Sequence, residues 1–216
     1  DYRVDATEIP IVNGNFEYTL KSNFKQEYSM AFKDELSKGS WMPIHFFNDK
    51  DTIRLTLFKR DNANLNVIHG GDLNYRLDVF KKKNRILFWD KIENLYKTKV
   101  DSLRKLKKWD SKKVEAIYVK LQKEKDAGNR NLIYKKLQKL RDAKKDLTPQ
   151  ARVYQNKIDS LVTKNQEAKD NFIKMDTTIL GFSMLMDNLY SNKYNKDFDY
   201  FTVVENIEKY QNKFKD

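Results

Sequence analysis

The apolar residues of this chain change their spacing once, at Asp72. Before Asp72, short segments alternate between apolar and polar residues, which is the pattern of half-buried β-strands. After Asp72, apolar residues recur at the spacing of amphipathic helices. The sequence therefore predicts an α+β fold, with a small antiparallel, sandwich-like β-sheet domain over residues 1–71 and an all-helical domain over residues 72–216.

The segment from residue 5 to residue 20, "DATEIPIVNGNFEYTL", carries the strongest hairpin signal. Its Asn13-Gly14 pair favours a two-residue turn with positive φ at both positions, which would place Val12 opposite Asn15. Pro10 has no N–H for a sheet ladder, so the first strand is expected at an edge. Because side chains alternate along a strand, one face of the hairpin would carry the apolar residues Ile9, Ile11, Phe16, Tyr18 and Leu20.

Further strands are expected in four segments, at residues 27–32, 42–47, 53–58 and 64–70. The connections are too short for crossover helices, so we expect one small antiparallel sheet of five or six strands, in which the polar turn "NDKDT" joins two neighbours. Gly70-Gly71 indicates a corner between the last strand and the first helix. The expected core of this sheet comprises Phe16, Tyr18, Phe46, Leu55 and Leu57.

The helical part is expected to contain six helices. Cap residues predict two starts: Asp72, and Thr148 followed by Pro149 in the first turn. Another helix is expected to run from about Ser111, with Val114, Ile117 and Leu121 as its apolar stripe. The expected spans are residues 72–106 with a break near Lys83-Asn84, 111 to about 128, a helix containing Leu132 or Ile133 with Leu137 and Leu140, 149–175, 178–191 and 200–214.

The chain of 216 residues contains no cysteine. It can therefore form no disulfide, thiolate nucleophile or cysteine-based metal site. It starts with Asp1 and has no segment like a signal peptide, so we expect a mature or trimmed fragment. The longest apolar run, "ILGFSMLM" at residues 179–186, is too short to span a bilayer and is expected to be a buried helix.

The net charge of +12 comes from the middle of the chain, where residues 81–175 hold 28 Lys and Arg against 12 Asp and Glu. Two basic runs, "KKKNR" at 81–85 and "RKLKK" at 104–108, lie near Trp89 and Trp109 and could bind phosphates. Acidic residues are interleaved among them, which favours lysines that solvate helix faces. Nucleic acid is therefore the less favoured partner, and polyanion binding stays an alternative.

Nothing in the sequence predicts a catalytic, cofactor or metal site. His45 and His69 fall in expected strands without the spacing of metal ligands or of a catalytic pair. The glycines of "IHGGD" lack the spacing of a phosphate-binding loop. We expect this chain to contain no enzyme active site and no cofactor.

Three segments carry a family resemblance. "DATEIPIVNGNFEYTL", "IHFFNDKDTIRLTL" and "VIHGGDLNYRLDVF" resemble the strand pair, the paired strands around an acidic turn and the glycine-led start of a helix in one uncharacterised N-terminal domain. That domain precedes the thioredoxin-like (redoxin) domain in bacterial cell-envelope thiol-disulfide oxidoreductases. The helical remainder, ending in "NFIKMDTTILGFSMLMDNLY", is similar to the connector that follows it.

The resemblance implies a non-catalytic recognition or scaffold domain of a periplasmic, lipid-anchored protein, followed in the intact protein by a thioredoxin-like domain that performs the redox chemistry. Its partners would be that domain, a client protein or a second copy of the chain, and it would meet the membrane only through a lipid anchor outside this sequence. Two alternatives stay open: a basic helical module that binds nucleic acid or another polyanion, and a stand-alone adaptor lipoprotein.

Overall fold

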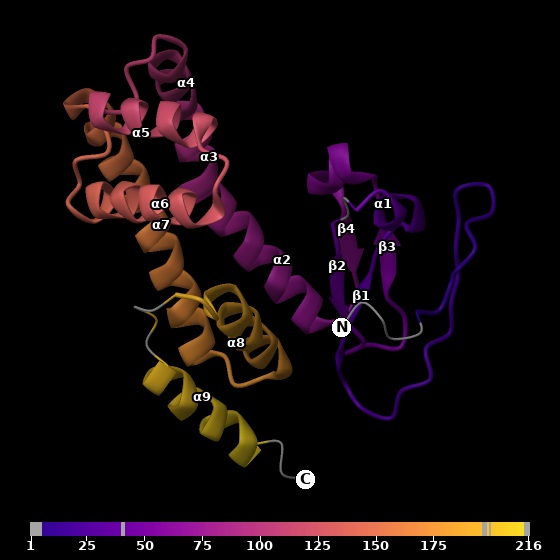
Figure 1. Cartoon of the computed structure of the whole chain (residues 1–216). Helices are drawn as coiled ribbons and strands as arrows, with labels where there is room; N and C mark the ends of the chain where they lie inside the picture. Colours follow the sequence, from indigo (N-terminus) through magenta and orange to yellow (C-terminus); the bar gives the residue numbers. More distant parts are fainter. Residues whose placement is uncertain (1–5, 40–41, 196–197, 199, 214–216) are drawn as a thin grey trace. The chain divides into compact units, whose positions relative to one another are not determined.

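The computed structural model describes residues 6–39, 42–195, 198 and 200–213 (Figure 1). The chain divides into two compact units, Asp1–Asp72 and Leu73–Asp216. The first contains short antiparallel strands and the second is helical, so the α+β prediction is confirmed. Within the described residues, no helix is both long and apolar enough to cross a membrane.

In the part of the first unit that the structure describes, there are two separate antiparallel sheets of two strands each. In one, β1 pairs with β2, and in the other, β3 pairs with β4. The elements in chain order are β1 (Glu27–Met30), α1 (Lys33–Ser37), β2 (Ile44–Phe47), β3 (Arg54–Thr56), the 3₁₀ helix η1 (Arg60–Leu65) and β4 (Val67–His69).

The expectation of one sheet with five or six strands is therefore wrong. All four segments after the hairpin do form strands, but β2 and β3, which flank the turn "NDKDT", do not pair with each other. Each sheet instead closes over an intervening helical turn, α1 in one and η1 in the other. Asn48 prolongs the first sheet, since its backbone N–H donates to Gln26 O and its side-chain oxygen accepts from Gln26 N at 2.6 Å.

The turn at Asn13-Gly14 is confirmed, whereas the strands around it are not. Asn13 and Gly14 have φ of 51° and 76°, and Val12 and Asn15 exchange backbone hydrogen bonds of 2.8 and 3.0 Å. No ladder follows this single bridge within the described residues, and Asp5 lies outside them. The expected apolar face is accordingly not buried, since Tyr18 is 48% exposed.

The core of the first unit is built on β2. Ile44, Phe46 and Phe47 are buried, and Phe46 stacks on Tyr28 with ring centres 5.7 Å apart. Of the expected core residues, Phe46 is buried, Phe16, Leu55 and Leu57 are half-buried and Tyr18 is exposed. A two-stranded sheet has too few neighbours to cover both ends of every strand, which explains this partial burial.

The corner at Gly70-Gly71 is confirmed. Gly70 has φ of 105°, and a Cβ there would lie 2.6 Å from the backbone oxygen of Thr52. Both the dihedral angle and the close backbone therefore require glycine. The helix that follows starts with Asp72 as its first residue, and not as its cap.

Among its described residues, the second unit contains one long composite helix and five others. The composite helix runs without interruption through α2 (Asp72–Asn84), η2 (Arg85–Trp89), α3 (Asp90–Ile92), η3 (Glu93–Lys97) and α4 (Thr98–Lys105), where η2 and η3 are π-helical turns. The others are α5 (Lys112–Lys123), α6 (Ala127–Asp142), α7 (Pro149–Met175), α8 (Ile179–Asn192) and α9 (Tyr200–Lys213).

Two expected helix limits are wrong. No break occurs near Lys83-Asn84, because Asn84 keeps helical dihedral angles and the chain absorbs the change of period in π-helical turns. Gly128 does not end a helix but lies in the first turn of α6, where the side chain of Asp126 caps the backbone N–H of Asn129 at 2.7 Å. The starts at Ser111 and Thr148 are confirmed, and Phe214 lies outside the described residues.

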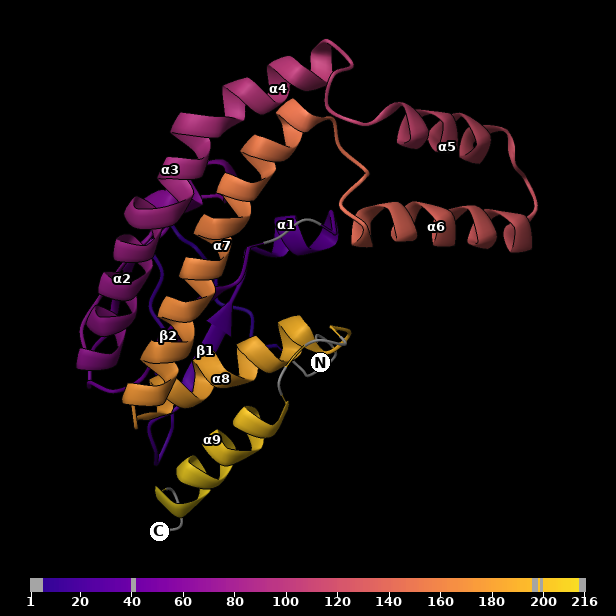
Figure 2. The same cartoon turned by 90° about the vertical axis from the view of Figure 1, so that its left-hand side faces the viewer.

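The composite helix and α7 run side by side in opposite directions, and the α5–α6 hairpin projects from the end where they meet (Figure 2). Phe80 packs against Phe172 with ring centres 4.7 Å apart, and Tyr96 packs against Tyr154 with ring centres 6.5 Å apart. Through these contacts, each of the two helices covers apolar side chains of the other.

The other end of α7 is fixed by a buried polar cluster around Asp176. The Asp176 carboxylate accepts from the backbone and hydroxyl of Thr178 at 2.7 and 2.5 Å and pairs with Arg76. Tyr210 of α9, which is 1% exposed, points its hydroxyl at the backbone oxygens of Asp176 and Ile173 at 2.5 and 3.0 Å. This cluster links the start of the composite helix with α7 and α9.

Candidate binding site

The two connections that join the α5–α6 hairpin to its support have the same sequence pattern. "LRKLKKWDS" starts at Leu103 and "LRDAKKDLT" starts at Leu140, so the pattern Leu-Arg-x-x-Lys-Lys-x-x-Ser/Thr occurs twice, 37 positions apart. The first copy connects α4 to α5 and the second connects α6 to α7. We call these two segments, residues 103–111 and 140–148, the double turn.

Both copies end their helix in the same way. Lys107 and Lys144 each have φ of 53°, in the left-handed region. The next residue donates its backbone N–H to the leucine that starts the pattern, at 2.8 Å in both copies. This is the Schellman arrangement, which satisfies the last carbonyls of a helix.

The two copies also cap each other. Ser111 N donates to Asp146 O at 2.8 Å, and Thr148 N donates to Trp109 O at 3.0 Å. The Ser111 hydroxyl donates to Lys145 O at 2.9 Å, while the Thr148 hydroxyl donates to Lys108 O at 2.7 Å. Each hydroxyl oxygen also accepts from the N–H three residues later in its own helix. The double turn is therefore a local two-fold arrangement that holds the hairpin at both of its ends.

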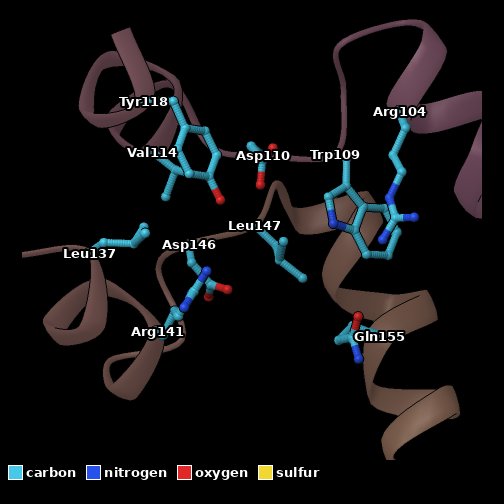
Figure 3. A pocket seen from close by; sticks show the side chains of 10 residues that line it. All are labelled: Arg104, Trp109, Asp110, Val114, Tyr118, Leu137, Arg141, Asp146, Leu147 and Gln155. Atoms are coloured by element: carbon cyan, nitrogen blue, oxygen red, sulfur yellow. The ribbon is translucent and has the colours of Figure 1, made fainter. Parts of the chain in front are cut away.

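A pocket of about 420 Å³ opens at the double turn (Figure 3). The members of four pairs of lining residues are 37 positions apart, so the pocket lies across the local two-fold. The pairs are Arg104 with Arg141, Trp109 with Asp146, Asp110 with Leu147 and Tyr118 with Gln155. Val114 and Leu137 contribute apolar walls, being 1% and 2% exposed.

The charged groups of the pocket are unequally paired. Asp146 forms an ion pair with Arg152, and the Arg104 guanidinium lies over the ring of Trp109, 5.1 Å from its centre. In the described part of the chain, neither the Asp110 carboxylate nor the Arg141 guanidinium forms an ion pair or a side-chain hydrogen bond. Figure 3 shows Asp110 and Tyr118 directing their polar groups into the pocket.

The pKa of Asp110 is raised above its ordinary value. Burial is the main cause, the negative charge of Glu115 adds to it, and the positive charges of Arg104 and Arg141 oppose it. Both guanidinium groups are therefore near enough to act on Asp110 without making an ion pair with it. A carboxylate in this position is available to a ligand.

The two histidines are not brought together. His45 lies on β2 and His69 on β4, which belong to different sheets. His45 Nδ1 lies 2.8 Å from a carboxylate oxygen of Glu27 on the neighbouring strand. Across the described residues, no group of three His, Asp or Glu side chains could hold a metal ion.

The two basic runs occupy different environments. Residues 81–85 lie on the composite helix, where Trp89 is 49% exposed. Residues 104–108 belong to the double turn, where Trp109 is 8% exposed and forms part of the pocket. The tryptophan near the first run is thus exposed, whereas the one near the second run is buried.

The pocket was missed from the sequence because its residues are spread from Arg104 to Gln155. One signal could have found it, namely the repeated Leu-Arg-x-x-Lys-Lys-x-x-Ser/Thr pattern. Each copy ends with a residue suited to cap a helix, so both copies predict that one helix ends and the next begins there.

Comparisons with protein-family models, with curated proteins and with solved structures found no match for this chain.

Proposed function

We propose that this chain is the non-catalytic recognition part of a cell-envelope protein of the thiol-disulfide oxidoreductase type, lipid-anchored in its intact form. The proposal combines the resemblance of the N-terminal segments with a chain that lacks the thiolate such chemistry requires. The redox step would then belong to a separate thioredoxin-like domain. The present chain would hold that domain's client or orient the domain itself.

The observation that carries the recognition role is the double turn. A hairpin that served only as a spacer would need no defined orientation. Here the α5–α6 hairpin is held at both crossings by paired backbone and hydroxyl hydrogen bonds of 2.7 to 3.0 Å. A binding surface gains affinity when it is preorganised in this way, because less conformational entropy is lost on binding.

The test starts from the complete gene and the whole protein. We expect a secretory signal, a following thioredoxin-like domain with Cys-x-x-Cys, and disulfide reductase activity in the purified product. Replacing residues 107–148 by a short Gly-Ser linker should slow reduction of a protein disulfide, for which insulin is the probe. The rate with a small aromatic disulfide should stay the same, since that substrate needs no recognition surface.

Two results would contradict the proposal. A complete gene without Cys-x-x-Cys would overturn the oxidoreductase context and favour the adaptor lipoprotein. Equal rates with insulin before and after the replacement would overturn the recognition role of the hairpin, provided that circular dichroism shows the remaining helices intact.

The polyanion alternative rests on the charge of the hairpin region, where residues 107–148 hold 14 Lys and Arg against 6 Asp and Glu. Against it, lysines elsewhere in the basic region form ordinary exposed pairs, such as Lys82 with Asp78 and Lys97 with Glu93. Retention on heparin that persists near 0.1 M salt and falls steeply at higher salt would favour this alternative.

A further inference from the structure

The pocket at the double turn holds opposite charges apart from each other. The Asp110 carboxyl group has no side-chain partner within the described residues, and the same is true of the Arg141 guanidinium. The Arg104 guanidinium lies over the face of Trp109. Of these residues Asp110 is half-buried, whereas Arg104 and Arg141 are exposed. A carboxyl group that is partly removed from water and left unpaired costs free energy, so a ligand that pairs with it would be stabilising.

The space between these charges is closed by apolar side chains. Val114 and Leu137 are almost fully buried beneath it, and Trp109 forms part of its wall. The volume of about 420 Å³ lies at the lower end of the range of small-molecule sites, about 300 to 1,000 Å³. The pocket therefore suits a small ligand with an apolar body.

We propose that this pocket binds a small zwitterion with an apolar side chain, of the α-amino-acid class. The ligand's carboxylate would pair with Arg141, its ammonium group with Asp110, and its side chain would lie against Val114 and Leu137. Tyr118 supplies a further hydroxyl directed into the pocket (Figure 3). This binding goes beyond the recognition role proposed above and does not depend on it.

A ligand with a single charge fits this pocket less well. A simple carboxylate would pair with the arginines but would face the negative charge of Asp110. A simple amine would pair with Asp110 but would face two guanidinium groups. Only a ligand that carries both charges satisfies both sides, because unpaired or like charges in a partly buried site oppose binding.

The experiment is isothermal titration calorimetry of the purified chain with three probes that share one side chain. They are L-phenylalanine, N-acetyl-L-phenylalanine, which lacks the ammonium charge, and L-phenylalaninamide, which lacks the carboxylate. We expect L-phenylalanine to bind at least about tenfold more tightly than either derivative, as for the loss of one charged hydrogen bond.

Two variants test the role of each charge. Arg141→Gln should weaken L-phenylalanine about tenfold or more and abolish its advantage over the amide, while Asp110→Asn should abolish its advantage over the N-acetyl derivative. Lys136→Gln and Glu167→Gln make the same charge changes at exposed positions outside the pocket and should leave all three affinities unchanged.

Several results would overturn the proposal. One is the absence of measurable heat with L-phenylalanine at millimolar concentration. Another is equal binding of L-phenylalanine and one derivative by the unaltered protein, since the pocket would then recognise only one charge. A third is that Lys136→Gln weakens binding as much as Arg141→Gln, because a general charge effect would then explain the loss. Arg141 forms no ion pair in the described structure, so its replacement should leave the fold intact, and thermal melting checks this.

Discussion

Removing the Ser111 or the Thr148 hydroxyl should destabilise the helical unit by comparable amounts. Each hydroxyl has the same two bonds in the two halves of the double turn. Ser111 accepts from Val114 N at 3.4 Å and donates to Lys145 O at 2.9 Å. Thr148 accepts from Ala151 N at 3.2 Å and donates to Lys108 O at 2.7 Å.

The magnitude follows from these two bonds. Loss of an N-cap hydroxyl costs about 0.5 to 2 kcal/mol, and loss of one further hydrogen bond about 0.5 to 1.5 kcal/mol. Both residues are half-buried, so water can replace part of the loss at each. We therefore expect a loss of about 1 to 2 kcal/mol for each of Ser111→Ala and Thr148→Ala, with Thr148→Ala nearer the upper value because its two bonds are shorter.

The two substitutions should also be coupled. Both hydroxyls support one backbone bridge between Asp110 and Leu147, so once either is lost the other holds a loosened bridge. The double variant should cost less than the sum of the single variants by about 0.5 kcal/mol or more. In hydrogen exchange, Thr148→Ala should reduce protection of the Ser111 amide, which donates to Asp146 in the other copy.

The assay is urea unfolding followed by far-ultraviolet circular dichroism, which reports the helices. Ser102→Ala, at an exposed position within α4, is the control and should be neutral or slightly stabilising. Losses below about 0.3 kcal/mol for both variants, or an additive double variant with an unchanged Ser111 amide, would refute the idea that the double turn holds the hairpin.

Three further predictions concern single positions. Burial raises the pKa of Asp110, so the folded protein binds this proton more tightly than the unfolded chain does. The resulting stability is present below about pH 4 and is lost as the pH rises. Asp110→Asn should therefore raise the melting temperature at neutral pH but not near pH 3. Tyr210→Phe removes a buried hydroxyl that donates to backbone oxygens, so it should lower the free energy of unfolding by about 1 to 3 kcal/mol at neutral pH. Because burial raises the pKa of Tyr210 to about 12, this difference in unfolding free energy should shrink as the pH rises from about 10 towards 12. Gly70→Ala should destabilise the first unit by more than about 1 kcal/mol in urea unfolding, because it combines a positive φ with a backbone clash, whereas Gly14→Ala, with open space around its position, should cost less.

The features that the sequence predicted correctly are those that depend on a few neighbouring residues. Thr148 followed by Pro149 starts α7, and Ser111 caps α5, because each hydroxyl reaches an N–H only three residues away. Asn13-Gly14 forms its turn because both residues tolerate positive φ. The wrong limit near Gly128 also concerns a local signal. Asp126 caps α6, so Gly128 lies in the first turn of α6 and does not end α5.

The features that the sequence did not predict depend on residues far apart in the chain. Alternation marked β1 to β4, but it could not tell that β2 pairs with β1 and not with β3. Nor could it tell that Tyr18 would stay exposed, because burial requires a neighbouring surface as well as an apolar residue.

The sequence by itself determined the α+β class, the starts of the main helices and the absence of any cysteine chemistry, because composition and local hydrogen bonds do not depend on the rest of the fold. The tertiary structure decided the pairing of the strands and the site. Arg104 and Arg141 occupy the same position of the repeated sequence pattern, yet only the crossing of the two turns brings them to one pocket. There the positive charges of both act on the pKa of Asp110. Charge acts through space, so the chemistry of this pocket exists only where the folded chain places those side chains near one another.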